Sequence, residues 1–421
     1  MTTTASMNKS DPLRRIYLYI YSMLLFFSPL VYVNNTNELY EFPKMFFVYV
    51  LGAIVAAIFV IERLFSGREI KRPNYIVLLI LLTAGISTLF SSHSYTSLWG
   101  YYTRFNSGLV SLITYVGLYF VAINVFEPKD YRLLFRFVAF STLMVSVYGI
   151  AQNFIGVVRV YSTIGQPNWL AQYLVMVLPI LVYEYLGGKK RMNLWLFTYL
   201  MSYLCLWFTY SLSGLIGFAV SSLVLVVLFY KDLDKEKINR LAMLGVITVA
   251  VSLLFPGIFK DKLIDINQDV SKLRFSFVPH VYALGDGNKV SDPGYIRFGL
   301  WRGSLDVIRS SFKVFSIGSG LGTFPYVFQD YRPLSLNYSS EWDFVFNKPH
   351  NYYLELWIET GIVGLLAYLI FLFGLFKRVP KPFIPVLMAF VVTNFFGWPT
   401  VVTNVLFWVL VAPLGYERDK K

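Results

Sequence analysis

The sequence predicts an all-α, polytopic helical membrane protein with about 12 transmembrane helices and one long extracytoplasmic loop that contains short amphipathic helices. Of its 421 residues, 56% are hydrophobic and only 14% are charged, whereas soluble globular chains carry about 25% charged residues. The hydrophobic residues form blocks of about 20 residues, the length that a helix needs to cross a bilayer. Basic residues gather in alternate connections between these blocks, a pattern typical of membrane topology.

Apolar length predicts the spans in order along the chain. Nine of them precede the long loop, near 16–33, 45–62, 75–91, 108–126, 133–155, 169–186, 193–211, 213–230 and 241–256. Three follow it, near 351–376, 383–397 and 402–416. Because no small-residue cleavage site is evident near the first span, we expect a retained helix there and not a removed signal peptide.

Lysines and arginines assign each connection to one side of the membrane. The basic connections carry Arg63, Arg68, Lys71 and Arg72, then Lys129, Arg132 and Arg136, then Lys189, Lys190 and Arg191, then Lys231, Lys235, Lys237 and Arg240, and finally Lys377, Arg378 and Lys381. The short connections on the opposite face carry only Lys44, Arg104 and Arg159. The alternation predicts that both termini are cytoplasmic.

We expect a single integral membrane domain in three parts. These are a bundle of about nine helices over 1–256, an extracytoplasmic loop over 257–350, and about three helices over 351–421. A loop of this length in a compact protein is usually functional. Within it, "GLWRGSLDVIRSSF" has apolar residues at helical spacing, namely Leu300, Trp301, Leu305, Ile308 and Phe312. This pattern predicts an amphipathic helix lying on the membrane face.

Several function classes lack support in the sequence. The net charge of +13 lies in short loops beside apolar spans, so it indicates orientation, and no nucleic-acid partner is expected. Cys205 is the only cysteine, which excludes an intramolecular disulfide and favours a packing role. None of His93, His280 and His350 stands in a metal motif. No phosphate loop or nucleophile elbow occurs, and we expect no metal and no cofactor.

The stretch "NKPHNYYLELWIETGIVG" places polar residues at the mouth of a membrane helix, where they are costly and commonly functional. His350 is the best candidate for a general base, because imidazole accepts a proton near neutral pH. The alternative is an interfacial histidine that only caps the helix. Glu355 and Glu359 share a helix face. Either one would orient the histidine or pair with a loop arginine, or form a structural ion pair.

Arginines on the outer face predict an anion site. Guanidinium groups bind phosphate oxygens through a planar fork. Arg104, Arg297 and Arg302 are our candidates for holding a pyrophosphate and stabilising its departure. The alternative for each is an anchor to lipid headgroups, which we prefer for Arg159 and Arg309.

Three glycines alternate in "IGSGLGTFPYVF", at Gly318, Gly320 and Gly322. This spacing predicts a turn at which the backbone passes close to another segment. Tyrosines and tryptophans are abundant near these candidates. They are typical both of sugar-stacking platforms and of the aromatic belt of membrane proteins, and the belt is the simpler explanation.

In this order, the segments resemble the O-antigen ligase and O-antigen polymerase family. The resemblance rests on the Gly-x-Gly-x-Gly-x-Phe stretch and on the His-Asn pair and Glu-x-Gly-x-x-Gly helix of "KPHNYYLELWIETGIVGLLAYL". Three upstream pieces are also similar: "LWGYYTRFNSGL", "TIGQPNWLAQYLVMVLP" and "YIRFGLWRGSLDVI". The resemblance covers about residues 97–376.

The resemblance implies a glycosyltransferase of the bacterial inner membrane. Such enzymes move a glycan from a polyprenyl (undecaprenyl) pyrophosphate carrier to an acceptor hydroxyl, typically on lipid A core, at the outer face of the bilayer, without a nucleotide sugar or a metal. His350 then corresponds to the base, and Arg104 and Arg297 to the groups that hold the pyrophosphate. Supporting positions that match the motifs are Asn168, Gly318, Gly320, Gly322, Asn351 and Glu359.

One position departs from the family pattern. Many relatives carry an arginine after a serine in the turn "FTYSLSGLIG", where this chain has Leu212. Another outer arginine replaces it, or the pyrophosphate is held differently. An O-antigen polymerase, a protein O-oligosaccharyltransferase and a transporter or flippase for lipid-linked glycans remain alternatives, as does a non-catalytic scaffold.

Overall fold

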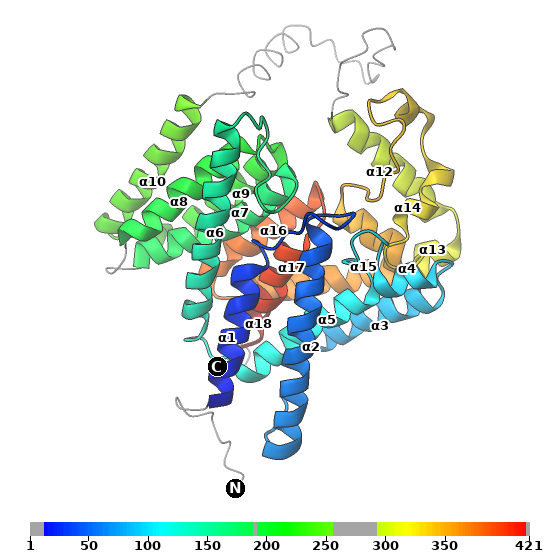
Figure 1. The fold of residues 1–421 in the computed structure, drawn as a ribbon, viewed down its shortest axis with the longest axis horizontal. Coiled ribbons are helices and arrows are strands. Elements are labelled where there is room, and N and C mark those ends of the chain that lie inside the picture. The colour runs from blue at the N-terminus through cyan, green and yellow to red at the C-terminus, as the bar shows by residue number, and fades with distance from the viewer. Residues whose placement is uncertain (1–11, 188–191, 256–292, 418–421) are drawn as a thin grey trace.

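The computed structural model describes residues 12–187, 192–255 and 293–417. These residues form helices joined by turns and loops, and no β-strand occurs in the three ranges. Figure 1 shows the helices of the first and last thirds of the chain intermingled in one bundle. The predicted all-α fold is confirmed for this part of the chain. His280 and the stretch 257–292 of the predicted loop lie outside the described residues.

Each of the twelve predicted spans overlaps a helix. The nine before the long loop are α1 (Pro12–Phe27), α2 (Glu41–Ser66), α3 (Tyr75–Leu89), α5 (Leu109–Val125), α6 (Tyr131–Phe154), α7 (Pro167–Gly187), α8 (Met192–Phe208), α9 (Leu212–Phe229) and α10 (Lys235–Leu254). After the loop come α15 (Tyr352–Arg378), α16 (Ile384–Phe395), and α17 (Val401–Leu406), which continues through a π-helical turn into α18 (Ala412–Glu417). The short helix α4 (Ser94–Trp99) was not predicted.

Six of these helices are long and apolar enough to cross a membrane: α2, α6, α7, α9 with the 3-10 turn that follows it, α10 and α15. Others, such as α3, α5 and α8, are apolar but shorter. The chain is therefore a helical membrane protein, and the count of about twelve spans stays a prediction.

Several helix starts follow from local sequence. The side chain of Asn74 accepts a hydrogen bond from the backbone N–H of Ile76 at the start of α3, at 3.0 Å. Asp234 does the same for Lys237 in α10, at 2.8 Å. Short polar side chains at these positions satisfy backbone donors that have no partner within the helix.

One hydrophobic core unites helices from α1 to α18. The Tyr21 hydroxyl of α1 donates to the Leu118 carbonyl of α5 at 2.7 Å. Tyr119 of α5 packs edge-on against Trp408, with ring centroids 5.9 Å apart. Cys205 is fully buried in the same core, as its predicted packing role requires. The helices after the long loop thus pack within the first bundle.

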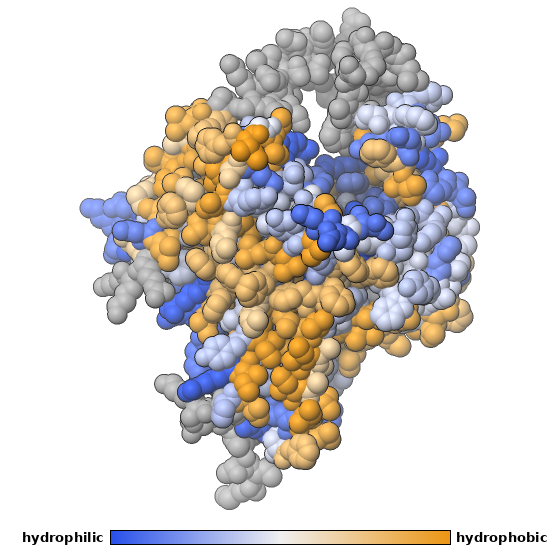
Figure 2. Space-filling model, viewed as in Figure 1, coloured by the Kyte–Doolittle hydropathy of each residue, from blue (hydrophilic) through white to orange (hydrophobic). Residues whose placement is uncertain are grey.

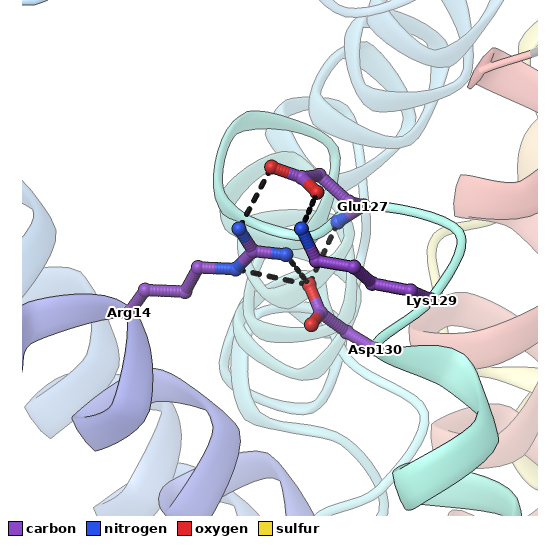
Figure 3. A network of polar contacts seen from close by, with 4 residues as sticks. All are labelled: Arg14, Glu127, Lys129 and Asp130. Atoms are coloured by element: carbon purple, nitrogen blue, oxygen red, sulfur yellow. Dashed lines mark hydrogen bonds and ion pairs between the residues drawn. The ribbon is translucent and has the colours of Figure 1, made fainter. Parts of the chain in front are cut away.

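A buried ion-pair network fastens α1 to the connection between α5 and α6 (Figure 3). The Arg14 guanidinium contacts Glu127 Oε1 at 2.7 Å and Asp130 Oδ2 at 2.5 Å. Lys129 pairs with the other oxygen of Glu127, and the Glu127 backbone N–H donates to Asp130 at 2.9 Å. Arg14 is buried, so these carboxylates compensate a positive charge that is shielded from water.

The long loop ends in a second, smaller core. It is built by α12 (Pro293–Arg309), α13 (Phe312–Ile317), α14 (Phe324–Val327) and the 3-10 turns Gln329–Tyr331 and Leu334–Tyr338. Leu300 and Ile308 of α12 are buried there, together with Phe324 and with Ile358 of α15.

A helix is observed where one was predicted around residues 299–312, but α12 begins earlier, at Pro293, and ends at Arg309. That it lies on the membrane face stays a prediction, although part of its apolar face packs on protein. Leu300 and Ile308 pack inward against protein, whereas Phe312 is largely exposed. The physical reason is that Phe324 and neighbouring loop residues supply an apolar partner within the chain, which the sequence pattern of α12 alone does not reveal.

The two ends of the bundle differ in character. In Figure 1, α12 and α14 lie at the upper edge, while the first turn of α1 and the Ser66 end of α2 lie at the lower edge. Figure 2 shows apolar side chains over much of the lower and left part of the molecule, and a hollow with hydrophilic side chains beside α12–α14. The candidate residues of the loop therefore lie at the end opposite to the first turn of α1.

Candidate active site around His350

The glycine-rich stretch lies backbone to backbone against a break in α15. The Ser319 N–H donates to the Ile358 carbonyl at 2.8 Å, and the Gly320 N–H donates to the Glu359 carbonyl at 3.2 Å. Helix α15 is broken at Gly361, whose φ is 70°. A Cβ atom on Gly361 would lie 2.1 Å from the Ser316 carbonyl oxygen. The close backbone approach that the glycine spacing predicts is observed.

The other glycines fit the same arrangement. A Cβ atom on Gly318 would lie 2.3 Å from the Glu359 carbonyl oxygen, and one on Gly320 would lie 2.3 Å from the hydroxyls of Ser91 and Ser97. Gly318, Gly320 and Gly322 all have positive φ, a conformation open to glycine at little cost. These residues form the frame of the site.

Glu359 holds this frame from within α15. Its carboxylate faces the backbone N–H groups of Gly322 and Phe324, and its backbone carbonyl accepts from the Ser87 hydroxyl of α3. The side chain is almost completely buried. Glu359 therefore joins the glycine stretch, α3 and α15.

His350 lies directly before α15 in an unusual backbone conformation. Its φ is 54°, a left-handed value that is uncommon for residues other than glycine and concentrates at functional sites. Its imidazole packs edge-on against Trp398, with ring centroids 5.0 Å apart. The next residue, Asn351, caps α15: its side chain accepts from the N–H groups of Tyr353 and Leu354 at 3.0 and 3.1 Å. Asn351 thus fixes the backbone beside His350.

The environment of His350 keeps its imidazole neutral. Burial, and then the positive charge of Arg297 on α12, lower the pKa of His350 to about 4. Neutral imidazole is the form that accepts a proton. The fold thus brings together two candidates, Arg297 and His350, that are separated by most of the loop.

A chain of aromatic rings connects His350 with Arg104. Trp398 packs edge-on against Trp169 of α7, with ring centroids 5.9 Å apart. The Arg104 guanidinium lies over the Trp169 ring, 5.1 Å from its centroid, a cation–π arrangement. The Arg104 Nε is buried without a hydrogen-bond partner within the described ranges. Arg104 and His350 are therefore connected through the contacts of Trp169 and Trp398.

Asn168 and Arg159 lie at the turn in which Leu212 replaces the expected arginine. The Ser211 hydroxyl donates to Asn168 Oδ1 at 2.8 Å. Arg159 donates from Nε to the Thr209 carbonyl at 3.1 Å and from Nη2 to Asn168 Oδ1 at 3.4 Å. The structure thus places a guanidinium within one turn of Leu212, although the sequence offered Arg159 only as a headgroup anchor.

The remaining arginines are less closely tied to His350. Arg302 is exposed, and because it follows Arg297 by five residues it points roughly 140° away around α12. Arg332 donates to the carbonyls of Glu341, Trp342 and Phe344 and therefore holds the loop together. Of the three predicted pyrophosphate contacts, the structure brings Arg104 and Arg297 toward His350 and leaves Arg302 at the surface.

Lys348 is a residue that the sequence reasoning missed. It is buried two residues before His350 and pairs with Glu355. Burial opposes its charge, but the neighbouring Glu355 and Glu359 raise the pKa of Lys348, so the amine stays protonated. For Glu355, the alternative of a structural ion pair is observed. The sequence did contain a signal for this ion pair, because Lys348 stands just before a membrane helix that carries two glutamates.

The comparisons with known proteins agree with the motifs. Residues 196–369 match the family model described as O-antigen ligase. This range includes Arg297, the three glycines and His350, whereas Arg104 and Asn168 precede it. A search of the curated proteins finds no matching relative.

Proposed function

The chain carries a domain of the O-antigen ligase family, and from this premise we propose that it transfers a glycan from a polyprenyl (undecaprenyl) pyrophosphate carrier to an acceptor hydroxyl at the outer face of the inner membrane. The family supports a ligase or polymerase type of enzyme. The acceptor in this proposal is lipid A core or another glycan or protein on the same face. The lipid bilayer supplies the carrier.

The observation that supports the proposal is a neutral histidine, His350, on which Arg297 acts and which Arg104 approaches through two tryptophan rings. His350 takes the proton from the acceptor hydroxyl as the acceptor oxygen bonds to the anomeric carbon of the donor sugar. The bond between that carbon and the pyrophosphate oxygen breaks, and the pyrophosphate leaves with the bonding electrons. A pKa of about 4 keeps the His350 imidazole unprotonated at neutral pH, the form that a general base requires.

The arginines stabilise the charge that develops on the leaving pyrophosphate. Arg297 lies near His350. Arg104 lies over the ring of Trp169, which packs against Trp398 beside His350. Arg159, next to Leu212, supplies the guanidinium that this turn lacks in sequence. Arg302 is the further guanidinium of α12, exposed toward incoming substrate. Asn168, Asn351, Glu359 and the three glycines position these groups.

Replacing His350 tests the proposal. In membranes containing the full chain and its lipid-linked glycan, His350→Ala should lower transfer by about 100-fold or more, the usual contribution of general-base catalysis. His93→Ala is the matched control, because His93 stacks on Tyr326 with centroids 4.1 Å apart and has no role in the proposed reaction. Full transfer by a folded His350→Ala variant would refute the base assignment.

A liposome experiment separates transfer from transport. The proposal predicts new glycosidic bonds when donor and acceptor share the outer leaflet. Movement of the carrier across the bilayer without bond formation would instead identify a transporter.

A further inference from the structure

A pocket lies along one face of α15 and reaches Trp398, which contacts His350. Trp398, the ring that contacts His350, is one of its walls, and Tyr352, Glu355 and Glu359 of α15 form another. Its water-accessible space is about 80 Å³, enough for roughly five to eight water molecules at 10–15 Å³ each. This is room for one small polar group, comparable to a single sugar ring.

Three oxygens at this pocket lack partners in the part of the chain that the structure describes. They are Glu355 Oε2, Glu359 Oε1 and the Ser107 hydroxyl, and all three residues line the pocket. Both glutamates are only 3% exposed. Leaving a buried polar atom without a partner is unfavourable, so these atoms indicate a ligand.

The unpartnered oxygens are held in place by their neighbours. Lys348 binds the other oxygen of Glu355, and the backbone N–H groups of Gly322 and Phe324 face the Glu359 carboxylate. Each carboxylate therefore has one half engaged with protein and one half free. Such fixed acceptors recognise a ligand that donates hydrogen bonds.

The charges around the pocket restrict the class of ligand. The described residues that line the pocket offer no unpaired positive charge to a phosphate or another anion, because the Lys348 ammonium pairs with Glu355. The Lys348 ammonium already occupies the position of a cation beside Glu355, and the positive Arg104 also acts on Glu355. A neutral group rich in hydroxyl donors fits these acceptors, and the Trp398 and Tyr352 rings offer apolar faces beside them.

We propose that this pocket binds one sugar ring next to the reacting bond, with Glu355, Glu359 and Ser107 accepting hydrogen bonds from its hydroxyls. The proposal rests on the proposed function and assigns to these residues the recognition of the glycan. The ring belongs to the donor glycan or to the acceptor, since both present the same hydroxyl chemistry. The pyrophosphate stays with the arginines, outside the carboxylate pocket.

Ser107→Ala and Glu359→Gln are the variants that test this pocket. Ser107→Ala removes a hydroxyl that has no protein partner, so no hydrogen bond of the described fold is lost. Glu359→Gln keeps a carbonyl oxygen for the glycine stretch and replaces the free acceptor with a donor. Ser221→Ala is the control, because Ser221 of α9 is buried, donates to the Phe218 carbonyl and does not line the pocket.

The first measurement is transfer by the full chain in membranes, with donor and acceptor varied separately. Ser107→Ala should raise KM for one of the two by about three- to tenfold, and Glu359→Gln by about tenfold or more, the loss expected for one neutral or one charged hydrogen bond. The substrate whose KM changes identifies the source of the ring. Unchanged KM values for both substrates, with active wild-type protein, would overturn the pocket assignment but not the proposed function.

The second measurement does not depend on transfer. Saturation-transfer NMR would record the binding of methyl glucoside, methyl galactoside and methyl N-acetylglucosaminide to the full chain in nanodiscs. At least one glycoside should give a signal with the wild type and the Ser221→Ala variant that falls several-fold with Ser107→Ala and Glu359→Gln. Absence of binding, or equal signals in all four proteins, would mean that the pocket holds only water and would overturn the proposal.

Discussion

At the scale of single residues, the position of His350 determines its acidity. Its left-handed backbone turns the chain into α15, its ring rests on Trp398, and Arg297 acts on it from α12. A cation near a histidine disfavours the imidazolium form, as burial does. The same arginine that we assign to the pyrophosphate therefore also keeps the base free of its proton.

The acid limb of the pH profile follows from this arrangement. Because protonation removes the base and the pKa of His350 is about 4, kcat/KM should stay level as pH falls through 6.5, the ordinary value of histidine, and should decline only near pH 4 to 5. The measurement is kcat/KM for glycan transfer against pH, since this ratio reports the free enzyme.

Arg297→Gln should move this limb in a defined direction. Removal of the positive charge makes the imidazolium less unfavourable, so the pKa of His350 rises and activity is lost at a higher pH than in the wild type. Arg309→Gln, at the exposed end of the same helix, is the control and should leave the limb in place. An Arg297→Gln profile that coincides with the wild type would contradict the coupling.

At the scale of elements, the site depends on two contacts between segments far apart in sequence. The stretch from Ser316 to Gly320 fits against the break in α15, and Arg14 holds α1 to the connection before α6. The first contact sets the position of α15, and with it His350. The second stabilises the opposite end of the bundle and should affect stability but not the reaction.

Gly361→Ala should disrupt the first contact. The added methyl group would lie 2.1 Å from the Ser316 carbonyl oxygen, and alanine disfavours the φ of 70°, so the stretch would have to move. We expect unfolding in detergent at a temperature lower by several degrees, together with loss of transfer. Gly374→Ala in the same helix is the control: its Cβ would meet nothing closer than Arg378 at 3.8 Å, and helical Gly→Ala changes are neutral or stabilising. Equal stability of the two variants would contradict a stabilising contact between the glycine stretch and the break in α15.

Arg14→Ala should weaken the second contact. It leaves Asp130 buried without its guanidinium, and breaking a buried pair in this way costs about 3–5 kcal/mol. Arg15→Ala changes an exposed neighbour and should cost little. Thermal unfolding separates the two variants. An Arg14→Ala protein as stable as Arg15→Ala would show that the network in Figure 3 contributes nothing.

At the scale of the whole molecule, the parts that the sequence predicts are those set by local rules. Span lengths and helix caps such as Asn74 depend on neighbouring residues. The alignment of Trp169 with Trp398 and the position of Arg159 beside Leu212 depend on the packing of segments far apart in the sequence. The pairing of Lys348 with Glu355 is local, seven residues along the chain, and a lysine before two helical glutamates was its signal. No spacing in the sequence encodes the contacts between distant segments, which is why the pocket was missed, whereas His350 was proposed from a local motif and its role stays a prediction.

Orientation in the membrane is the property of the whole molecule that can be tested most directly. The distribution of lysine and arginine predicts that the connection before α10 is cytoplasmic and that α12 faces the outside. Lys235 and Asp306 are exposed positions in these two places, and the only native thiol, Cys205, is buried. An impermeant maleimide added to spheroplasts should therefore label Asp306→Cys at once, label Lys235→Cys only after permeabilisation, and leave the wild-type chain unlabelled. Because the proposed donor and acceptor both lie in the outer leaflet, labelling of Lys235→Cys in sealed spheroplasts would invert the topology and place His350 on the wrong side of the membrane for the reaction.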